Sequence, residues 1–424
     1  MVDQGIPYIH NRFSAVDESN LHFHGLHVSG ELPSDDSTHV VGPGQRYEYQ
    51  TSLPHNHMPG THWIHPHRHG STALQVAGGA VSALIVEDPP NSLPPQVENA
   101  TEVLFLAHLV HLEEIQEITS ASRDGLMAFS GSQTAPFVTV NGQVKPAISI
   151  VQGEWFRMRT IWASWLQGDL DLNIPTCEMQ LLAKDGIYIR DFPRSIQTAR
   201  IPPGGRADLM VRCLQPATTY PVIGLDGVTI ATIQTTAAPT VQSADLQRWT
   251  PIYPEYLTDL QSATASPGCA CETEFDGVGT VNGYSFDPNR GLHTSYLGAI
   301  VERLLEAQNH PYHQHVYPFQ LISGFRDDGY HAVGDWHDTL AGDGVIRYQP
   351  KVFPGKIMVH CHRLDHEDQG MMSIERVNAS GMTCTCVEPA GLAPEIVVAI
   401  VIGSVLVAGI AIGLIVKKYK KVDP

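Results

Sequence analysis

The segment HCHRLDHEDQGMM, from His360 to Met372, decides how the rest of the chain is interpreted. On a strand, successive side chains point to opposite faces, so His360 and His362 project to one side and Cys361 to the other. A copper ion bound by the Cys361 sulfur would then be joined, through one residue of backbone on each side, to metals bound by the two histidines. The segment therefore predicts a strand that carries electrons between two metal sites.

The same segment supplies further ligands for a metal bound to sulfur. Blue-copper sites use two histidines, one cysteine and a long axial methionine. His366 and Met371 follow the cysteine, and NHPYHQHVYPFQ offers a second histidine at His310, directly before a proline that restricts the backbone. The predicted electron-accepting copper is bound by His310, Cys361, His366 and axial Met371. An isolated Cys361 would instead be interpreted as a buried structural residue.

The alternating histidine pattern recurs in three further segments: LHFHG, WIHPHRHG and HPYHQHVY. Each pair places two imidazoles on one face of a strand. The paired histidines are His22 and His24, His65 and His67, His313 and His315, and His360 and His362. One such pair is a weak signal, but four pairs match three metal ions with two, three and three histidine ligands.

These four segments resemble the four copper motifs of the multicopper oxidases, the family of laccases, ascorbate oxidases, ferroxidases, cuprous oxidases and bilirubin oxidases. The resemblance includes FVTVNGQ and IPPGGRADLMV and covers nearly all of the chain before residue 380. It implies that His22 and His313 bind a type 2 copper. The resemblance divides the ligands of the two type 3 coppers into His24, His65 and His362, and His67, His315 and His360.

The family implies a reaction as well as a ligand set. Substrates would give up one electron at a time at the type 1 copper, and the trinuclear cluster would reduce dioxygen to water. The expected partners are dioxygen and a phenol, an aromatic amine or a low-valent metal ion. Acidic side chains deliver protons in this family, and Glu367, Asp35 and Asp36 occupy suitable places. Each of the three could instead be a solvated surface carboxylate.

Two alternative functions remain open at this point. A copper nitrite reductase shares cupredoxin domains but uses one catalytic type 2 copper, so the paired histidines argue against it. The other alternative is an inactive surface protein that only binds copper. Metal-ion substrates are also open, although the ten methionines are scattered rather than gathered in an insertion of the kind that cuprous oxidases carry.

The composition and the positions of the turn-forming residues predict the architecture. Short runs rich in Val, Ile, Leu and Thr, interrupted by Gly and Pro, predict an all-β chain. We expect three cupredoxin-like Greek-key β-sandwich domains at 1–91, 97–248 and 275–380, separated by EDPPNSLPPQ and TTAAPTVQSADLQRWTP. The trinuclear cluster should lie between the first and last domains, because they hold all the histidine pairs. A net charge of -18 argues against nucleic acid as a partner.

The C-terminal sequence predicts a membrane anchor. After a stalk at 381–395, the run Ile396–Val416 is apolar apart from Ser404 and several glycines, and it is long enough to cross a bilayer. The basic tail at 417–424 should then lie in the cytoplasm, with the copper domains outside the cell. At the other end, His22 follows Met1 so closely that we expect an N-terminal segment to be missing.

Six cysteines remain after Cys361 is assigned to copper, and on an exported chain they predict three disulfides. Cys177 and Cys213 form one plausible bridge in the central domain. Two CxC pairs flank the last domain and predict two disulfides that close this domain near its base, with the connectivity open. The alternative is a copper-loading site built from the four thiol groups. These pairs are Cys269 with Cys271 and Cys384 with Cys386. Asn99 and Asn378 are possible glycan acceptors.

Overall fold

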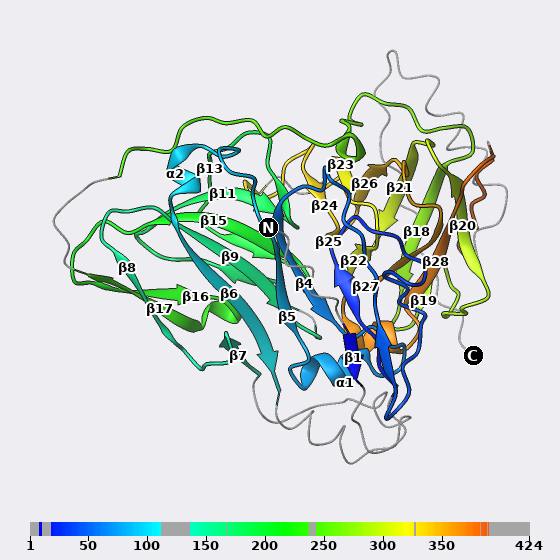
Figure 1. The fold of residues 1–424 in the computed structure, drawn as a ribbon, viewed down its shortest axis with the longest axis horizontal. Helices are drawn as coiled ribbons and strands as arrows, with labels where there is room; N and C mark the ends of the chain where they lie inside the picture. Colours follow the sequence, from blue (N-terminus) through cyan, green and yellow to red (C-terminus); the bar gives the residue numbers. More distant parts are fainter. Residues whose placement is uncertain are drawn as a thin grey trace, which may run out of the picture.

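The computed structural model describes residues 8–10, 18–111, 136–166, 168–236, 243–325, 328–381, 383–387 and 389. Strands dominate these residues and the helices are few and short, so the predicted all-β class is confirmed (Figure 1). Among them, no helix is both long and apolar enough to cross a membrane. The expected membrane segment Ile396–Val416, the tail 417–424 and most of the stalk 381–395 lie outside the described residues.

The first sheet group carries two of the histidine pairs. Its three-stranded sheet has the order β2-β4-β5, and β1 pairs separately with β3. The elements are β1 (Tyr8–His10), β2 (His22–His24), β3 (Arg46–Glu48), β4 (Gly60–His65), α1 (Thr72–Ala77) and β5 (Ser82–Val86). The antiparallel register sets His22 opposite His65 and His24 opposite Trp63. Behind β2, Phe23 packs in a small core with Tyr49.

The middle sheet group contains none of the predicted copper ligands. A sheet of seven strands has the order β12-β11-β15-β9-β6-β7 with β13 on β11, beside sheets β16-β17-β8 and β10-β14. Strands β9 and β15 are buried along their whole length, in a core that includes Trp162 and Leu209. The elements are α2 (Pro95–Glu98), β6 (Thr101–Val110), β7 (Phe137–Val140), β8 (Ala147–Val151), β9 (Phe156–Ala163), β10 (Leu170–Leu172), β11 (Glu178–Lys184), β12 (Ile187–Tyr188), β13 (Arg194–Ser195), β14 (Ala199–Ile201), β15 (Arg206–Arg212), β16 (Thr219–Ile223), η2 (Leu225–Gly227), β17 (Thr229–Thr236) and η3 (Glu255–Leu257).

The last sheet group is a sandwich of two sheets with a shared core. The orders are β19-β18-β21-β26-β23-β24 and β20-β28-β27-β22-β25. Leu321 from one sheet and Val359 from the other belong to the same buried cluster. The elements are β18 (Ala270–Asp276), β19 (Thr280–Val281), β20 (Gly291–Tyr296), β21 (Val301–Glu306), β22 (Pro311–Gln314), β23 (Phe319–Ser323), β24 (Trp336–His337), β25 (Thr339–Ala341), β26 (Gly344–Tyr348), β27 (Gly355–Cys361), α4 (Leu364–Asp368) and β28 (Met372–Asn378).

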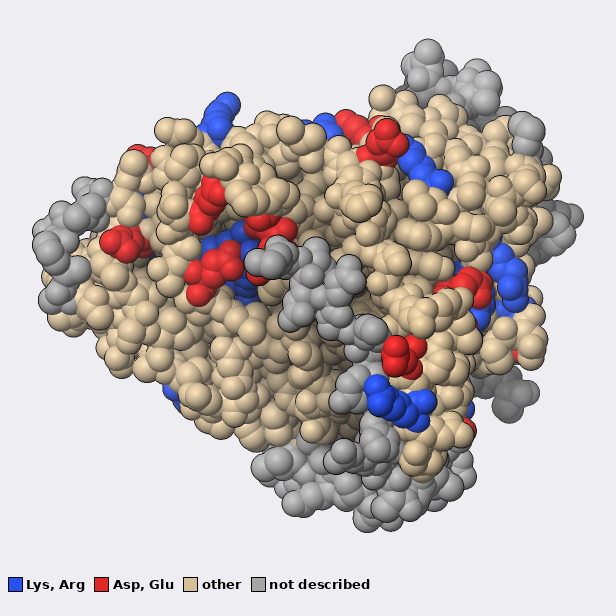
Figure 2. Space-filling view, in the orientation of Figure 1, with Lys and Arg blue, Asp and Glu red and all other residues tan. Residues whose placement is uncertain are grey.

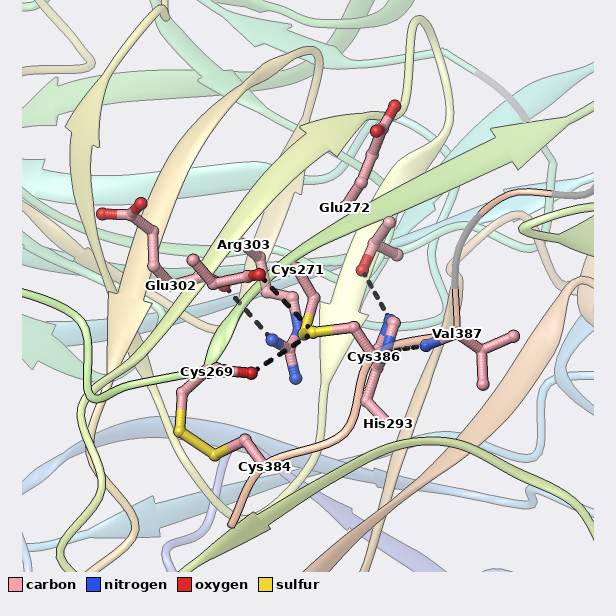
Figure 3. The surroundings of a disulfide bond; sticks show 12 residues. Cys269, Cys271, Glu272, His293, Glu302, Arg303, Cys384, Cys386 and Val387 are labelled. Atoms are coloured by element: carbon pink, nitrogen blue, oxygen red, sulfur yellow. Dashed lines mark hydrogen bonds between the residues drawn. A yellow bond between two sulfur atoms is a disulfide. The ribbon is translucent and has the colours of Figure 1, made fainter. Parts of the chain in front are cut away.

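All three expected disulfides are present. Cys177 is bonded to Cys213, as predicted. The two CxC pairs are joined in parallel, and Figure 3 shows these bridges side by side with His293 next to them. The bonds are Cys269–Cys384 and Cys271–Cys386. They tie the chain after β28 to the beginning of β18 and thereby close the last sheet group.

Buried contacts hold the first sheet group between the other two. In Figure 1, β4 and β5 lie between the middle strands β6 and β9 and the last-group strands β22 and β27. On the middle side, the Thr61 hydroxyl donates to Asp208, which also accepts from Arg157 and Arg159. On the other side, Asp368 of α4 accepts the backbone N–H groups at the start of α1. On the face in Figure 2, acidic and basic side chains occur together in small groups.

Candidate metal centre

The cysteine site forms where three segments of the last sheet group meet. Cys361 ends β27, His310 precedes β22, and His366 lies in α4. The Cys361 Sγ lies 3.5 Å from His310 Nδ1, which lies 3.1 Å from His366 Nδ1. Met371 is fully buried, and its carbonyl accepts the Cys361 N–H at 3.0 Å. The structure thus brings two nitrogens and one sulfur together, with the expected axial residue hydrogen-bonded to the cysteine.

The strand registers bring the four histidine pairs to one place. His313 of β22 lies opposite His360 of β27, and β2 and β4 present their histidines in the same way. All eight imidazoles are buried. The shortest contacts are His67 Nε2–His360 Nε2 at 3.0 Å, His315 Nε2–His360 Nε2 at 3.3 Å, His22 Nε2–His313 Nε2 at 3.4 Å and His24 Nδ1–His65 Nε2 at 3.4 Å.

The contacts match the grouping that the resemblance implies only in part, because His22 also lies close to His315 and to His24 and His65. His67, His315 and His360 bring one ring nitrogen each within 4.8 Å of one another. His22 and His313, the pair expected at type 2 copper, are also in contact. In the remaining set, the ring centroid of His362 lies 5.0 Å from that of His24 and 5.5 Å from that of His65.

The electrostatics of this pocket fit bound cations. Burial lowers the pKa of His65 to about 3 and that of His360 to about 3, so the imidazoles are neutral and keep a lone pair. Both ring nitrogens of His362 are buried without a hydrogen-bond partner. Lone pairs that converge in a buried space repel one another unless a cation or a proton lies between them. Neutral imidazole is a preferred ligand of copper.

Hydrogen bonds at the backs of the rings set which nitrogen faces the pocket. His65 Nδ1 donates to the Pro66 carbonyl at 2.9 Å and His360 Nδ1 to the Cys361 carbonyl at 3.0 Å. Such contacts fix the tautomer and leave Nε2 free for a metal. His24 is reversed, because its Nε2 faces Asp338 Oδ1 at 3.3 Å and its Nδ1 faces the pocket.

Two of the three expected proton donors lie against the histidines. Glu367 is fully buried, accepts the Thr72 hydroxyl at 3.0 Å, and lies 3.5 Å from His67 Nδ1 and 3.6 Å from His360 Nδ1. Burial raises the pKa of Glu367 well above its usual range, so the carboxyl group can hold a proton at neutral pH. Its Oε2 has no hydrogen-bond partner.

The two aspartates after the first pair differ from each other. Asp35 Oδ2 lies 2.9 Å from His22 Nδ1, and burial raises the pKa of Asp35 to about 7. Asp36 is paired instead with Lys356 Nζ at 2.8 Å and accepts the Thr38 hydroxyl. Both aspartates line one pocket that also reaches His315.

Three residues at the site carry no signal in the histidine pattern. Asp338 contacts His24 and is paired with Arg206 of β15, and both are buried. Asp368 joins α4 to α1. Arg206 lies in IPPGGRADLMV, so the resemblance of this segment to the family was the available hint. Nothing in the sequence spacing sets Asp338 and Asp368 apart from the other aspartates of the chain.

Histidines outside the four pairs are mostly buried. His57 Nε2 accepts the backbone N–H of His27 at 2.9 Å. His62 is buried, and neither of its ring nitrogens has a hydrogen-bond partner. Five further histidines that belong to no pair are also buried: His27, His108, His111, His331 and His337.

Comparison with known proteins agrees with this geometry. Two sequence models, both described as multicopper oxidase, match residues 8–91 and 250–379. The chain belongs to the multicopper oxidase family. Multicopper oxidase mco of Staphylococcus haemolyticus is 24% identical over 372 residues, which cover 84% of this chain and 76% of that protein. Iron transport multicopper oxidase fetC of Epichloe festucae is 26% identical over 177 residues, which cover 41% of this chain and 27% of that protein.

Solved structures show the same fold. A laccase from Pediococcus acidilactici superposes with a TM-score of 0.70 at 20% identity, covering 87% of this chain and 80% of that one. The McoA multicopper oxidase from Aquifex aeolicus gives 0.69 at 20% identity, covering 88% and 86%. The chain therefore has the all-β, cupredoxin-like multicopper oxidase fold. As a member of this family it is an oxidoreductase that binds copper and couples substrate oxidation to the reduction of dioxygen.

Proposed function

We propose that this multicopper oxidase holds four copper ions in two centres. The type 1 ion is held by His310, Cys361, His366 and Met371, the type 2 ion by His22 and His313, and the type 3 ions by His24, His65 and His362 and by His67, His315 and His360. One observation carries the proposal: two neutral, buried histidines flank a buried cysteine on β27, and six more histidines meet them.

The route for electrons follows the strand. When bound, the coppers accept single electrons at one centre and reduce dioxygen at the other. Cys361 Sγ lies beside His310, whereas His360 on the same strand contacts His67 of the histidine cluster, and His362 directly follows the end of the strand. The backbone of three consecutive residues thus joins the two centres, which need no other connection.

Protons are supplied by Glu367 and Asp35. Glu367 reaches His67 and His360, while Asp35 reaches His22, so the two carboxyl groups stand on different sides of the histidine cluster. A buried carboxyl group with a raised pKa gives up its proton when charge changes beside it. The pairing of Asp36 with Lys356 favours a structural role for Asp36.

The reducing substrate is best described as neutral or cationic. His310 is half-buried and therefore offers a way for electrons to enter from the surface. Burial lowers the pKa of His310 and the Arg363 guanidinium lowers it further, whereas Asp365 and Asp276 raise it, so charges of both signs lie close to this ring. The preference for low-valent metal ions, aromatic amines and phenols over anionic reductants therefore rests on the net charge of -18.

We place the oxidase on the outer face of a cell membrane. The support is the apolar run Ile396–Val416 and the basic residues that follow it. Asn99 and Asn378 are exposed and accessible for glycans. Protease treatment of intact cells should remove the oxidase activity and leave a short membrane-bound fragment. Activity that stays with the soluble fraction after gentle lysis would contradict this placement.

Copper counting with oxygen uptake tests the function. The full chain, loaded with copper, should hold about four ions, absorb intensely in the visible range, and consume oxygen with phenols, Fe(II), Cu(I) or Mn(II). The Cys361→Ser variant should lose the visible absorption and the oxidase activity but still bind copper at the histidines. Two ions per chain would indicate a nitrite reductase-like enzyme, and few or none an inactive binding protein. Visible absorption that survives in Cys361→Ser would refute the assigned sulfur ligand.

A further inference from the structure

Arg206 of the middle sheet group reaches the residues behind the histidine cluster, although this sheet group supplies none of the proposed ligands. Arg206 begins β15 and is fully buried. Its Nη1 donates to Asp338 Oδ1 at 2.7 Å and its Nη2 to Asp338 Oδ2 at 2.5 Å, which is a two-point, charge-assisted contact. Its Nε donates to the carbonyl of Thr61 on β4. One guanidinium therefore joins all three sheet groups behind the histidines.

Asp338 in turn contacts histidines from two sheet groups. Its Oδ1 lies 3.3 Å from His24 Nε2, and its backbone carbonyl lies 2.8 Å from His313 Nδ1. The Thr339 hydroxyl donates to the same Oδ1 at 2.8 Å. With both carboxylate oxygens engaged by Arg206, the carboxylate cannot rotate without breaking this set of contacts.

The fixed Asp338 carboxylate determines which ring nitrogen of His24 faces the pocket. When Asp338 accepts a hydrogen from Nε2, the lone pair of the neutral ring lies on Nδ1. Nδ1 faces His65 Nε2 at 3.4 Å, on the pocket side. His22, His65, His313 and His360 have the opposite arrangement, with Nδ1 engaged at the back of the ring.

The backbone next to His24 is adapted to this contact. Gly25 has φ +91°, and a Cβ atom built on it would overlap Nη2 of Arg206. The same Cβ would lie 2.9 Å from Asp338 Oδ2. Glycine is thus required directly after His24 for the guanidinium and the carboxylate to approach the β2 backbone.

We propose that Arg206 is a positioning residue of the copper centre: it clamps Asp338 so that His24 offers Nδ1, and not Nε2, to a type 3 copper. The inference rests on the proposed four-copper function and extends it. It assigns a task at the cluster to a sheet group that carries no ligand. Arg206 acts on copper only through Asp338 and His24.

The test compares Arg206→Gln with Arg212→Gln in the full, copper-loaded chain. Arg212 ends the same strand, and its partners Glu178 and Asp245 lie outside the histidine cluster. In Arg206→Gln we expect an additional Cu(II) signal in electron paramagnetic resonance, because the type 3 pair is no longer coupled. We also expect kcat about 10- to 100-fold lower at unchanged KM for the reductant. The visible absorption of the Cys361 site should not change, and Arg212→Gln should resemble the parent protein in every readout.

A second variant separates positioning from stability. Removing Arg206 alone leaves a buried carboxylate without its partner, which can prevent folding. The double variant Arg206→Gln/Asp338→Asn removes both charges and should recover most of the lost unfolding temperature, because Asp185, the other carboxylate beside Arg206, keeps its contact with His337. It should keep the altered copper spectrum, because nothing then selects whether the oxygen or the NH₂ of residue 338 faces His24.

The outcomes distinguish the two proposals. A parent-like copper spectrum in the double variant, or in Arg206→Gln, would overturn the positioning role while the four-copper function stands. A parent protein that holds no type 3 copper would overturn the proposed function itself. Arg206→Lys keeps the charge but cannot make the two-point contact, so it should give an intermediate spectrum.

Discussion

Replacing Gly204 by alanine should displace one proposed copper ligand, His362, although no ligand residue is itself substituted. Gly204 lies in the turn before β15 and has φ +83°. A Cβ atom at this position would lie 2.5 Å from Cδ2 of His362, whereas ordinary contact begins at 3.4 Å. The imidazole would therefore have to move by about 0.9 Å, the difference between these distances.

The effect on activity should be much larger than the effect on stability. An alanine in the left-handed backbone region costs about 1–2 kcal/mol, and a buried clash adds to this. A metal ligand tolerates displacements of only about 0.2 Å. A misplacement of about 1 Å in an active site can lower the rate about 100-fold. We expect kcat to fall by about that factor and the type 3 copper held by His362 to be lost or uncoupled.

Gly227 provides a matched control. It has φ +73°, and nothing lies within 4 Å of a Cβ atom built on it. Gly227→Ala therefore carries the same kind of backbone cost without a clash. Both variants should be measured for copper per chain, electron paramagnetic resonance, oxygen uptake and unfolding temperature. The visible absorption of the Cys361 site should be equal in both.

Two results would refute this reasoning. If Gly204→Ala has a kcat within about twofold of Gly227→Ala and an unchanged copper spectrum, the middle sheet group does not fix the His362 ring. If both variants lose copper equally, backbone strain and not the contact with His362 is the cause.

Three further predictions follow from buried groups. Glu367→Gln should lower kcat about 10²- to 10⁴-fold in oxygen-uptake assays while anaerobic reduction of the visible chromophore keeps its rate, and slowed reduction would contradict the proton-donor role. Although burial alone would raise the pKa of Asp208, its two arginine partners hold it below the usual value, so this carboxylate stabilises the fold above pH about 4 and less as pH falls. Asp208→Asn should therefore cost about 3 kcal/mol in neutral denaturant unfolding and less in acid, whereas Asp171→Asn, at a half-buried ion pair with Arg200, should cost under about 1 kcal/mol at either pH. Cys271→Ser/Cys386→Ser should cost far less than the roughly 5 kcal/mol of a bridge that spans 115 residues, because the neighbouring disulfide closes the same loop; a full loss in urea unfolding would contradict this.

The ligand-bearing strands could be predicted because their signal is local. A histidine at every second position on a strand places two imidazoles on one face. Only His22 and His24 share a strand in this way, because His67, His315 and His362 lie just beyond the ends of β4, β22 and β27. The same alternation predicts that Cys361 projects away from His360 and His362. The all-β class follows from equally local features, namely short apolar runs and frequent turn residues. Each of these inferences needs only a few consecutive residues.

The orientation of the rings could not be predicted, because it depends on contacts between distant parts of the chain. Asp338 fixes His24 from a position far along the sequence, and Arg206 fixes Asp338 from a third sheet group. In the sequence, Arg206 is one charged residue at the beginning of an apolar strand and resembles an ordinary surface position. Only the docking of the sheet groups makes it a buried cation that is paired with Asp338 and donates to the Thr61 carbonyl.

A middle sheet group without ligands is therefore not a spacer. It places the Gly204 turn against His362 and the Arg206 guanidinium against Asp338, so two of the three histidines proposed for one type 3 copper are held from outside the groups that carry them. Because metal binding in such a pocket requires all three groups to be docked, copper affinity and the docking of the middle group must be thermodynamically linked. Copper should then stabilise the contacts of the middle group as strongly as those between the two ligand-bearing groups, although it touches neither Gly204 nor Arg206.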